Sequence, residues 1–152
     1  MPVNYSFYAI PATWVVGMSS HWYGIALTMF SKSLPPFDNT DVRSFQSRIA
    51  NMDRKNPVVG KYVRAEAATS NTFETLPLFA VAVLAGAVAR LPLEQQHRFA
   101  FTYVGIRILY SLLYINVTSN KYSGIRSVVW LTGIVSIFNQ FIQAGKSFNQ
   151  AY

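Results

Sequence analysis

The chain has 152 residues, which is enough for one domain of ordinary size. It is 51% hydrophobic and only 12% charged, about half the charged share of a typical soluble domain, and this composition favours a membrane protein. The net charge of +7 suits an anionic ligand or a membrane surface, and the basic residues form no nucleic-acid-binding motif. The absence of cysteine excludes disulfides and protein-thiol catalysis. His21 and His97 lack the spacing of metal ligands, so we expect no bound metal.

Four apolar stretches predict an all-α membrane protein. Crossing a bilayer takes about 20 helical residues, and the stretches cover about residues 7–30, 65–89, 99–117 and 123–142. A long polar loop, residues 31–64, separates the first two stretches, and the other connections are short. We therefore expect residues 1–152 to form a single four-span domain, a membrane four-helix bundle.

The basic residues predict which side of the membrane each loop faces. With four spans, the connections after the first and third spans share one side, which holds nine basic residues: Lys32, Arg43, Arg48, Arg54, Lys55, Lys61, Arg64, Lys121 and Arg126. The opposite side holds three: Arg90, Arg98 and Lys146. Because cytoplasmic loops carry the excess of lysine and arginine, we expect these two loops in the cytoplasm and both termini outside it.

The second expected span begins with polar residues on one side. At about 100° per residue, Arg64, Asn71 and Glu74 fall within an arc of about 80° around the helix. A charged side chain inside a membrane helix is costly, so it pairs with another group, faces the bundle interior or serves a function. These three residues are therefore candidates for a buried polar site.

The third expected span carries a matching polar face. Arg107, Tyr110 and Tyr114 are spaced i, i+3 and i+7, so they share one side of the helix. The short connection makes the second and third spans antiparallel neighbours. At about 1.5 Å per residue, Glu74 and Arg107 reach the same depth, about 15 Å from the cytoplasmic end of the bundle. We therefore predict a buried ion pair between Glu74 and Arg107.

The remaining polar groups point to a ligand site at the cytoplasmic end. Asn71, Tyr110 and Tyr114 lie nearer that surface, and Arg126 begins the last span there. A guanidinium binds a carboxylate with two parallel hydrogen bonds, and Glu74 can hold an ammonium group, so the set predicts a cleft for an anionic ligand. The alternative is that these groups only join the helices through interhelical hydrogen bonds.

Three short motifs follow one another along the second, third and fourth spans. The stretch ATSNTFETLPLF has the pattern Ala-x-x-Asn-x-x-Glu-x-x-Pro at Ala68, Asn71, Glu74 and Pro77. The stretch RILYSLLY has the pattern Arg-x-x-Tyr-x-x-x-Tyr, and IRS places Arg126 at the start of the last span. In this order the motifs resemble those of the membrane-associated proteins in eicosanoid and glutathione metabolism, the MAPEG family. Two positions depart from it: Ala67 stands where many members have arginine, and Thr75 where several have tyrosine.

The resemblance implies a homotrimer of four-helix subunits that binds glutathione between neighbouring subunits on the cytosolic side. Members of the family act as glutathione transferases, glutathione peroxidases or isomerases on lipophilic substrates. The glutathione-binding residues that it implies here are Arg64, Asn71, Glu74, Tyr110 and Tyr114. Arg126 is the implied catalytic residue, because a nearby guanidinium favours the thiolate form of glutathione.

We therefore expect a multi-pass membrane enzyme, a glutathione transferase or peroxidase that acts on lipophilic electrophiles or lipid hydroperoxides. Glutathione is its expected co-substrate, with no metal and no nucleic-acid partner. The expected location is the endoplasmic reticulum or another microsomal membrane in a eukaryote, and the inner membrane in a bacterium. The first alternative is a non-catalytic protein of the same architecture that binds lipid or serves as a scaffold. The second is an unrelated four-helix transporter or assembly factor.

Overall fold

The structure is a computed structural model that describes residues 3–150, and within that range its regular elements are all helical. A short 3-10 helix, η1 (Tyr5–Tyr8), leads directly into α1 (Ala9–Phe30). The chain continues through α2 (Val42–Ala50), α3 (Pro57–Val88), α4 (Leu93–Asn116) and α5 (Asn120–Gln150). The expected all-α fold is confirmed for the described residues.

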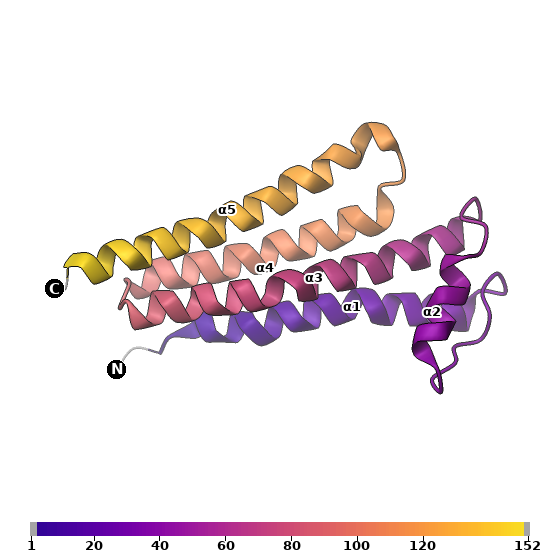
Figure 1. The fold of residues 1–152 in the computed structure, drawn as a ribbon, viewed down its shortest axis with the longest axis horizontal. Helices are drawn as coiled ribbons and strands as arrows, with labels where there is room; N and C mark the ends of the chain where they lie inside the picture. Colours follow the sequence, from indigo (N-terminus) through magenta and orange to yellow (C-terminus); the bar gives the residue numbers. More distant parts are fainter. Residues whose placement is uncertain (1–2, 151–152) are drawn as a thin grey trace.

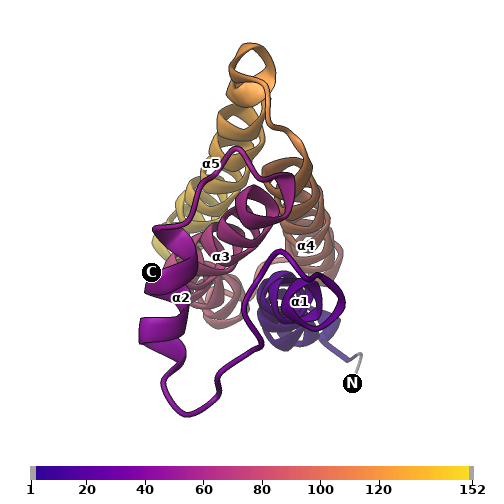
Figure 2. The ribbon, with the colours of Figure 1, turned by 90° about the vertical axis from the view of Figure 1, so that its right-hand side faces the viewer.

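The four long helices lie side by side along one axis (Figure 1). α3 packs against each of the other α-helices and occupies the middle of the end view in Figure 2. The start of α1 and the end of α5 lie at one end of the molecule, whereas α2 and the α4–α5 turn lie at the other (Figure 1). The basic segment after α1 and the connection after α4 therefore share one end, as the four-span interpretation requires.

Three of the described helices are long and apolar enough to cross a membrane: α3, α4 and the part of α5 from Asn120 to Phe148. α1 has 22 residues but is not among them, since serine, threonine and histidine interrupt its apolar sequence. Three of the four expected spans are thus confirmed by length and hydropathy, and membrane crossing by α1 stays a prediction.

α3, α4 and α5 begin before the apolar stretches that predicted them. α3 begins at Pro57, about two turns before the expected start near residue 65. The Asn56 side chain caps it by accepting a hydrogen bond from the Val58 N–H, and proline suits the first helical turn. α3 then continues through Pro77 to Val88. Hydropathy marks the part of a helix that suits lipid, so it misses such polar ends.

The expected polar loop contains a helix, α2, that lies across the end of α3 (Figure 2). Asp41 caps it by accepting a hydrogen bond of 3.1 Å from the Ser44 N–H, and hydrogen bonding to Ser44 holds the pKa of Asp41 below its usual value. Phe45 and Ile49 are fully buried in a cluster that includes Tyr62 of α3. Two apolar residues one turn apart therefore dock an otherwise polar helix.

α1 meets α3 through small side chains. The buried residues of α1 are Ala9, Thr13, Gly17, Ser20, Gly24 and Thr28. A Cβ atom on Gly17 would lie 3.1 Å from Cγ2 of Thr72, so the two helices approach closely there. Small residues allow such close packing between membrane helices, where lipid leaves little hydrophobic drive for association.

The largest apolar core lies toward the end that carries the termini. There the rings of Phe79 and Tyr103 stack with centroids 4.2 Å apart, in a cluster with Ala82, Ala100 and Ile137. This core joins α3, α4 and α5 near one end of the molecule. It therefore sets how these three helices are oriented toward one another.

Candidate functional site

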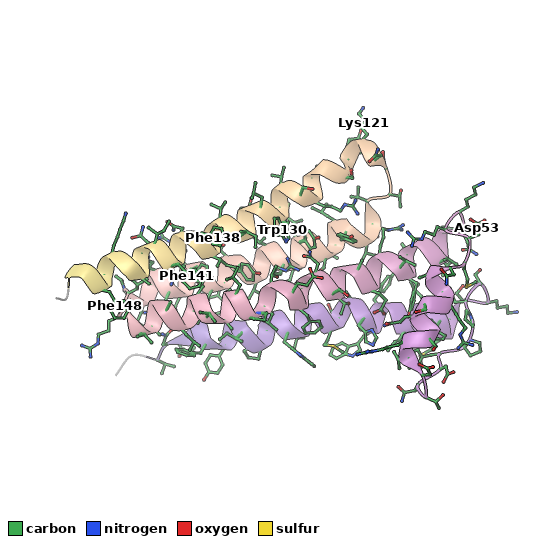
Figure 3. All side chains as sticks on the ribbon, in the orientation of Figure 1. Asp53, Lys121, Trp130, Phe138, Phe141 and Phe148 are labelled. Atoms are coloured by element: carbon green, nitrogen blue, oxygen red, sulfur yellow. The ribbon has the colours of Figure 1, made fainter. Side chains whose placement is uncertain are left out.

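A cavity of about 550 Å³ lies between α3, α4 and the first half of α5. It is lined by Asn71, Tyr110, Tyr114, Ser123, Gly124, Arg126, Ser127, Trp130 and Leu131. Figure 1 shows α5 diverging from α4 toward the α4–α5 turn, and Trp130, labelled in Figure 3, lies on the stretch of α5 that borders the cavity. The structure thus brings together four residues singled out in the sequence: Asn71, Tyr110, Tyr114 and Arg126.

Two arginines stack on two tyrosines beside this cavity. The guanidinium carbon of Arg126 lies 4.6 Å from the ring centroid of Tyr114, and that of Arg107 lies 4.7 Å from the ring centroid of Tyr110. The two tyrosine rings are 5.5 Å apart. Stacking on an aromatic face stabilises and orients a guanidinium while leaving its N–H groups free to donate. Arg126, which lines the cavity, can therefore present its N–H donors to an anion there.

Arg107 is buried behind the cavity, with only 2% of its surface exposed. One terminal nitrogen, Nη2, donates to Oδ1 of Asn71 at 3.1 Å and to Oγ1 of Thr72 at 2.8 Å. Its Nε has no hydrogen-bond partner among the described residues. Because Asn71 lines the cavity, Arg107 holds the amide of this residue in place.

The predicted ion pair between Glu74 and Arg107 is not present. No side-chain nitrogen of Arg107 lies within 4 Å of a carboxylate oxygen of Glu74, and the Glu74 side chain is exposed. Glu74 and Arg107 do not face each other because of how α3 is rotated about its own axis. The side of α3 that is buried against its neighbours carries Thr72, Thr75 and Phe79, and Glu74 lies about 100° around the helix from Thr75. Arg107 therefore uses neutral oxygen acceptors in place of a carboxylate.

Arg64, expected among the ligand-binding residues, holds the end of α4. Its Nε donates to the carbonyl oxygen of Ile115 at 2.8 Å. This carbonyl belongs to the last turn of α4, where backbone acceptors have no partner within the helix. Arg64 does not line the α3–α4–α5 cavity.

Trp130 is a cavity residue that the sequence motifs did not single out. Its indole Nε1 is buried and has no hydrogen-bond partner among the described residues, so it is available as a donor. Trp130 follows Arg126 by four residues, which puts both side chains on one face of α5. The i, i+4 spacing of an arginine and a tryptophan was the signal that could have identified it.

A polar contact that the sequence did not reveal joins α1, α2 and α3. The carboxylate oxygens of Glu66 lie 2.9 and 3.1 Å from Nδ1 of His21, and Gln46 donates to Glu66 at 2.9 Å. No local pattern links these residues, because His21 and Glu66 are 45 positions apart. None of the three lines the α3–α4–α5 cavity; the Gln46–Glu66 hydrogen bond joins α2 to α3, and the His21–Glu66 contact joins α1 to α3.

A known protein family matches the chain. No curated protein and no solved structure matches the chain. The sequence pattern of the MAPEG family matches residues 8–146, nearly the whole chain. Together with the three helices that can cross a membrane, this match shows that the chain is an integral membrane protein of the MAPEG family.

Proposed function

We propose that the protein is a glutathione-dependent transferase or peroxidase that acts on lipophilic electrophiles or lipid hydroperoxides. The observation that carries the proposal is the α3–α4–α5 cavity, where Asn71, two tyrosines and Arg126 meet. These are the motif residues of a family that includes glutathione-dependent enzymes. The cavity combines a cation with hydrogen-bonding groups, as an acidic peptide requires.

Each residue has a distinct role in the proposed site. Arg126 binds the sulfur of glutathione and stabilises it as the thiolate, since a nearby positive charge favours ionisation of a thiol. Asn71 hydrogen-bonds the peptide, and Tyr110 and Tyr114 border it. Glu74, exposed on α3, holds the ammonium group of glutathione.

The chemical step follows from a positioned thiolate. In a transferase reaction the sulfur attacks an electrophilic carbon, a carbon–sulfur bond forms and the leaving group departs with the bonding electrons. In a peroxidase reaction the sulfur attacks the terminal oxygen of a hydroperoxide, which yields an alcohol and a sulfenic acid, and a second glutathione reduces the latter to disulfide and water. In both cases the protein lowers the barrier by holding the thiolate in place.

The location of the cavity suits two substrates of opposite polarity. Glutathione is soluble and reaches the site from the end that carries α2, which we assign to the cytosol from its basic residues. A lipophilic substrate reaches the same site from the bilayer between helices. We propose that the site is completed between subunits of a homotrimer in a microsomal or bacterial inner membrane, with both termini non-cytosolic.

The alternative function is non-catalytic binding of lipid within the same architecture. Ala67, which stands where many members have arginine, and Thr75, where several have tyrosine, favour it because they remove two polar groups near the motif. Thr75 is buried and hydrogen-bonds to the backbone of its own helix, so it adds no donor to the cavity. The retained Arg126 favours the enzyme instead.

Arg126→Gln tests the proposal. Wild-type protein in detergent should produce a thiolate absorbance signal when glutathione is added, and should conjugate a generic electrophile or reduce a lipid hydroperoxide. Arg126→Gln should remove the thiolate signal and lower kcat/KM by about a hundredfold, by analogy with loss of one charge-stabilising donor.

Lys121→Gln is the matched control, since it removes one positive charge from the same end of α5 but lies outside the cavity. It should leave both signals unchanged. A wild-type protein with no thiolate signal and no activity, or an Arg126→Gln protein with full activity, would contradict the proposed enzyme and favour the lipid-binding alternative.

A further inference from the structure

A second polar cavity, of about 440 Å³, lies between α4 and α5 near the end that carries the termini. α4 contributes Gln95 and Arg98 to its lining, and α5 contributes Asn139, Gln140 and Gln143. The spacings i, i+3 on α4 and i, i+1, i+4 on α5 place these side chains on facing stripes of the two helices. Both helices are apolar enough to cross a membrane, and polar side chains on such helices are unfavourable unless they contact other polar groups. A polar ligand between the two stripes would supply those groups.

Gln140 forms the inner wall of this cavity, where α5 meets α3. Its side chain is 2% exposed, and its Nε2 has no hydrogen-bond partner among the described residues. The amide reaches from α5 to Gly86 of α3, where any Cβ atom would collide with it. This nitrogen therefore faces α3 and is closed off from the cavity, so the polar groups that a ligand can reach are those of Arg98, Gln95, Asn139 and Gln143.

The charge of the cavity favours an anion. Arg98 has no acidic group within 4 Å, since the ion pairs among the described residues are His21–Glu66 and Arg48–Asp38. The other polar groups in the lining are neutral amides and hydroxyls. A guanidinium that works with amide donors matches the oxygens of a phosphate group.

The depth of the cavity favours a lipid as the source of that phosphate. Arg98 lies five residues from the start of α4, or about 8 Å along the helix, a depth typical of headgroups. Beside the polar stripe, Phe138 (labelled in Figure 3) and Ile142 expose 53% and 56% of their surfaces. A phosphate held by Arg98 therefore has apolar surface next to it on which acyl chains can lie.

We propose that this cavity binds the phosphate group of an anionic phospholipid from the leaflet at the end of the bundle that carries the termini. The site shares no residue with the α3–α4–α5 cavity and does not depend on the proposed glutathione chemistry.

Lipid titration tests the proposal. The purified, delipidated full-length chain is titrated in detergent with phosphatidylglycerol, phosphatidylcholine or inorganic phosphate, and Tm is followed by circular dichroism. Phosphatidylglycerol should raise Tm to saturation at lower concentration than the other two. Arg98→Gln should weaken the apparent affinity about tenfold or more, the usual effect of losing a charge-assisted hydrogen bond. Gln143→Leu, which keeps the charge, should weaken it less.

Lys146→Gln is the control. It removes one positive charge from the end of α5 that borders the cavity, but Lys146 itself does not line the cavity. It should bind phosphatidylglycerol as the wild type does. Equal affinity in wild type, Arg98→Gln and Gln143→Leu would overturn the proposal. A rise in Tm that depends on Arg98 but is the same with inorganic phosphate as with phosphatidylglycerol would reject the lipid and leave a site for free phosphate.

Discussion

Arg107 is the largest fully buried side chain of the described residues, and its charge faces neutral oxygen atoms. Thr72 provides the shorter of its two hydrogen bonds, and Asn71 the other. A buried charge without sufficient acceptors is strongly unfavourable, so each of these contacts stabilises the fold more than an ordinary hydrogen bond does. Asn71 also lines the α3–α4–α5 cavity. Its hydrogen bond with Arg107 therefore both stabilises the buried charge and holds a residue of the candidate site in position.

Thr72→Val should therefore be destabilising. Valine has nearly the same shape but no hydroxyl, so Arg107 loses an acceptor while packing is kept. We expect the free energy of unfolding to fall by about 2 kcal/mol, the range measured for hydrogen bonds to charged groups. The measurement is unfolding in one detergent, followed by circular dichroism.

Thr132→Val provides the comparison for this change. Thr132 is exposed on α5, and its hydroxyl, like that of Thr72, donates to the carbonyl four residues earlier, but it contacts no arginine. It should alter stability by no more than about 0.5 kcal/mol. Equal effects of the two substitutions would show that Arg107 gains nothing from Thr72.

At the scale of elements, α2 depends on a small apolar contact and one polar contact. The ring of Phe45 meets the rings of Phe37 and Tyr62 edge to face, with centroids 5.4 and 6.2 Å away. Gln46 on the neighbouring face of α2 donates to Glu66 of α3. α2 lies at the end of the bundle toward which α5 diverges (Figure 1), so its docking covers the end of the molecule from which glutathione is expected to enter.

Phe45→Ala should release α2 without unfolding the long helices. Loss of a buried phenyl ring removes about 3 kcal/mol or more, which is large for a nine-residue helix. Trypsin should then cleave after Arg43 or Arg48 on the order of a hundredfold faster, because cleavage follows the population of the locally unfolded form. Helix content measured by circular dichroism should hardly change.

Phe30→Ala makes the same chemical change at a residue that is 88% exposed. Its cleavage rate in the α2 segment should equal that of the wild type. If Phe45→Ala is cleaved no faster than Phe30→Ala, α2 is not held by the contacts described above.

Helices that contact lipid could be predicted from the sequence, whereas a helix that is held only by contacts with the rest of the protein could not. Lipid-facing apolar stretches identify the centres of α3, α4 and α5, because the bilayer sets their minimum length. α2 was missed, because a helix docked by only Phe45 and Ile49 is indistinguishable from a polar loop by composition. The cap formed by Asn56 and Pro57 is a local signal that hydropathy does not register, so the start of α3 was predicted about two turns too late.

Spacing along one helix predicted more of the candidate site than pairing between helices did. The i, i+3, i+7 positions of Arg107, Tyr110 and Tyr114 place them on one face, and two of them reach the cavity. The partner of Arg107 could not be obtained in this way, because it depends on the rotation of α3 about its own axis. Packing of Gly17 of α1 against Thr72 contributes to that rotation, and it involves residues distant in sequence.

At the scale of the whole molecule, a single chain exposes the charged side chain of Glu74 on a helix that can cross a membrane. Glu74 lies 17 residues into the 32-residue α3, about 26 Å along it and near its middle, yet its side chain is exposed. An exposed carboxylate at that depth would face lipid, which is costly. A neighbouring subunit that covers this face of α3 removes the cost and brings Glu74 into a shared site, which supports the proposed homotrimer.

The proposal that a homotrimer completes the site can be tested by measurement. In a mild detergent, light scattering should give a protein mass of three times 17.1 kDa, and glutathione should form its thiolate. Exchange into a harsher detergent that yields monomers should abolish the thiolate signal, because Glu74 then loses the neighbouring subunit that completes the site. Circular dichroism must show that the helices survive the exchange, and return to the mild detergent should restore both trimer and thiolate. A helical monomer that forms the thiolate as well as the trimer does would place the whole site within one subunit, and the exposed Glu74 would then need another explanation.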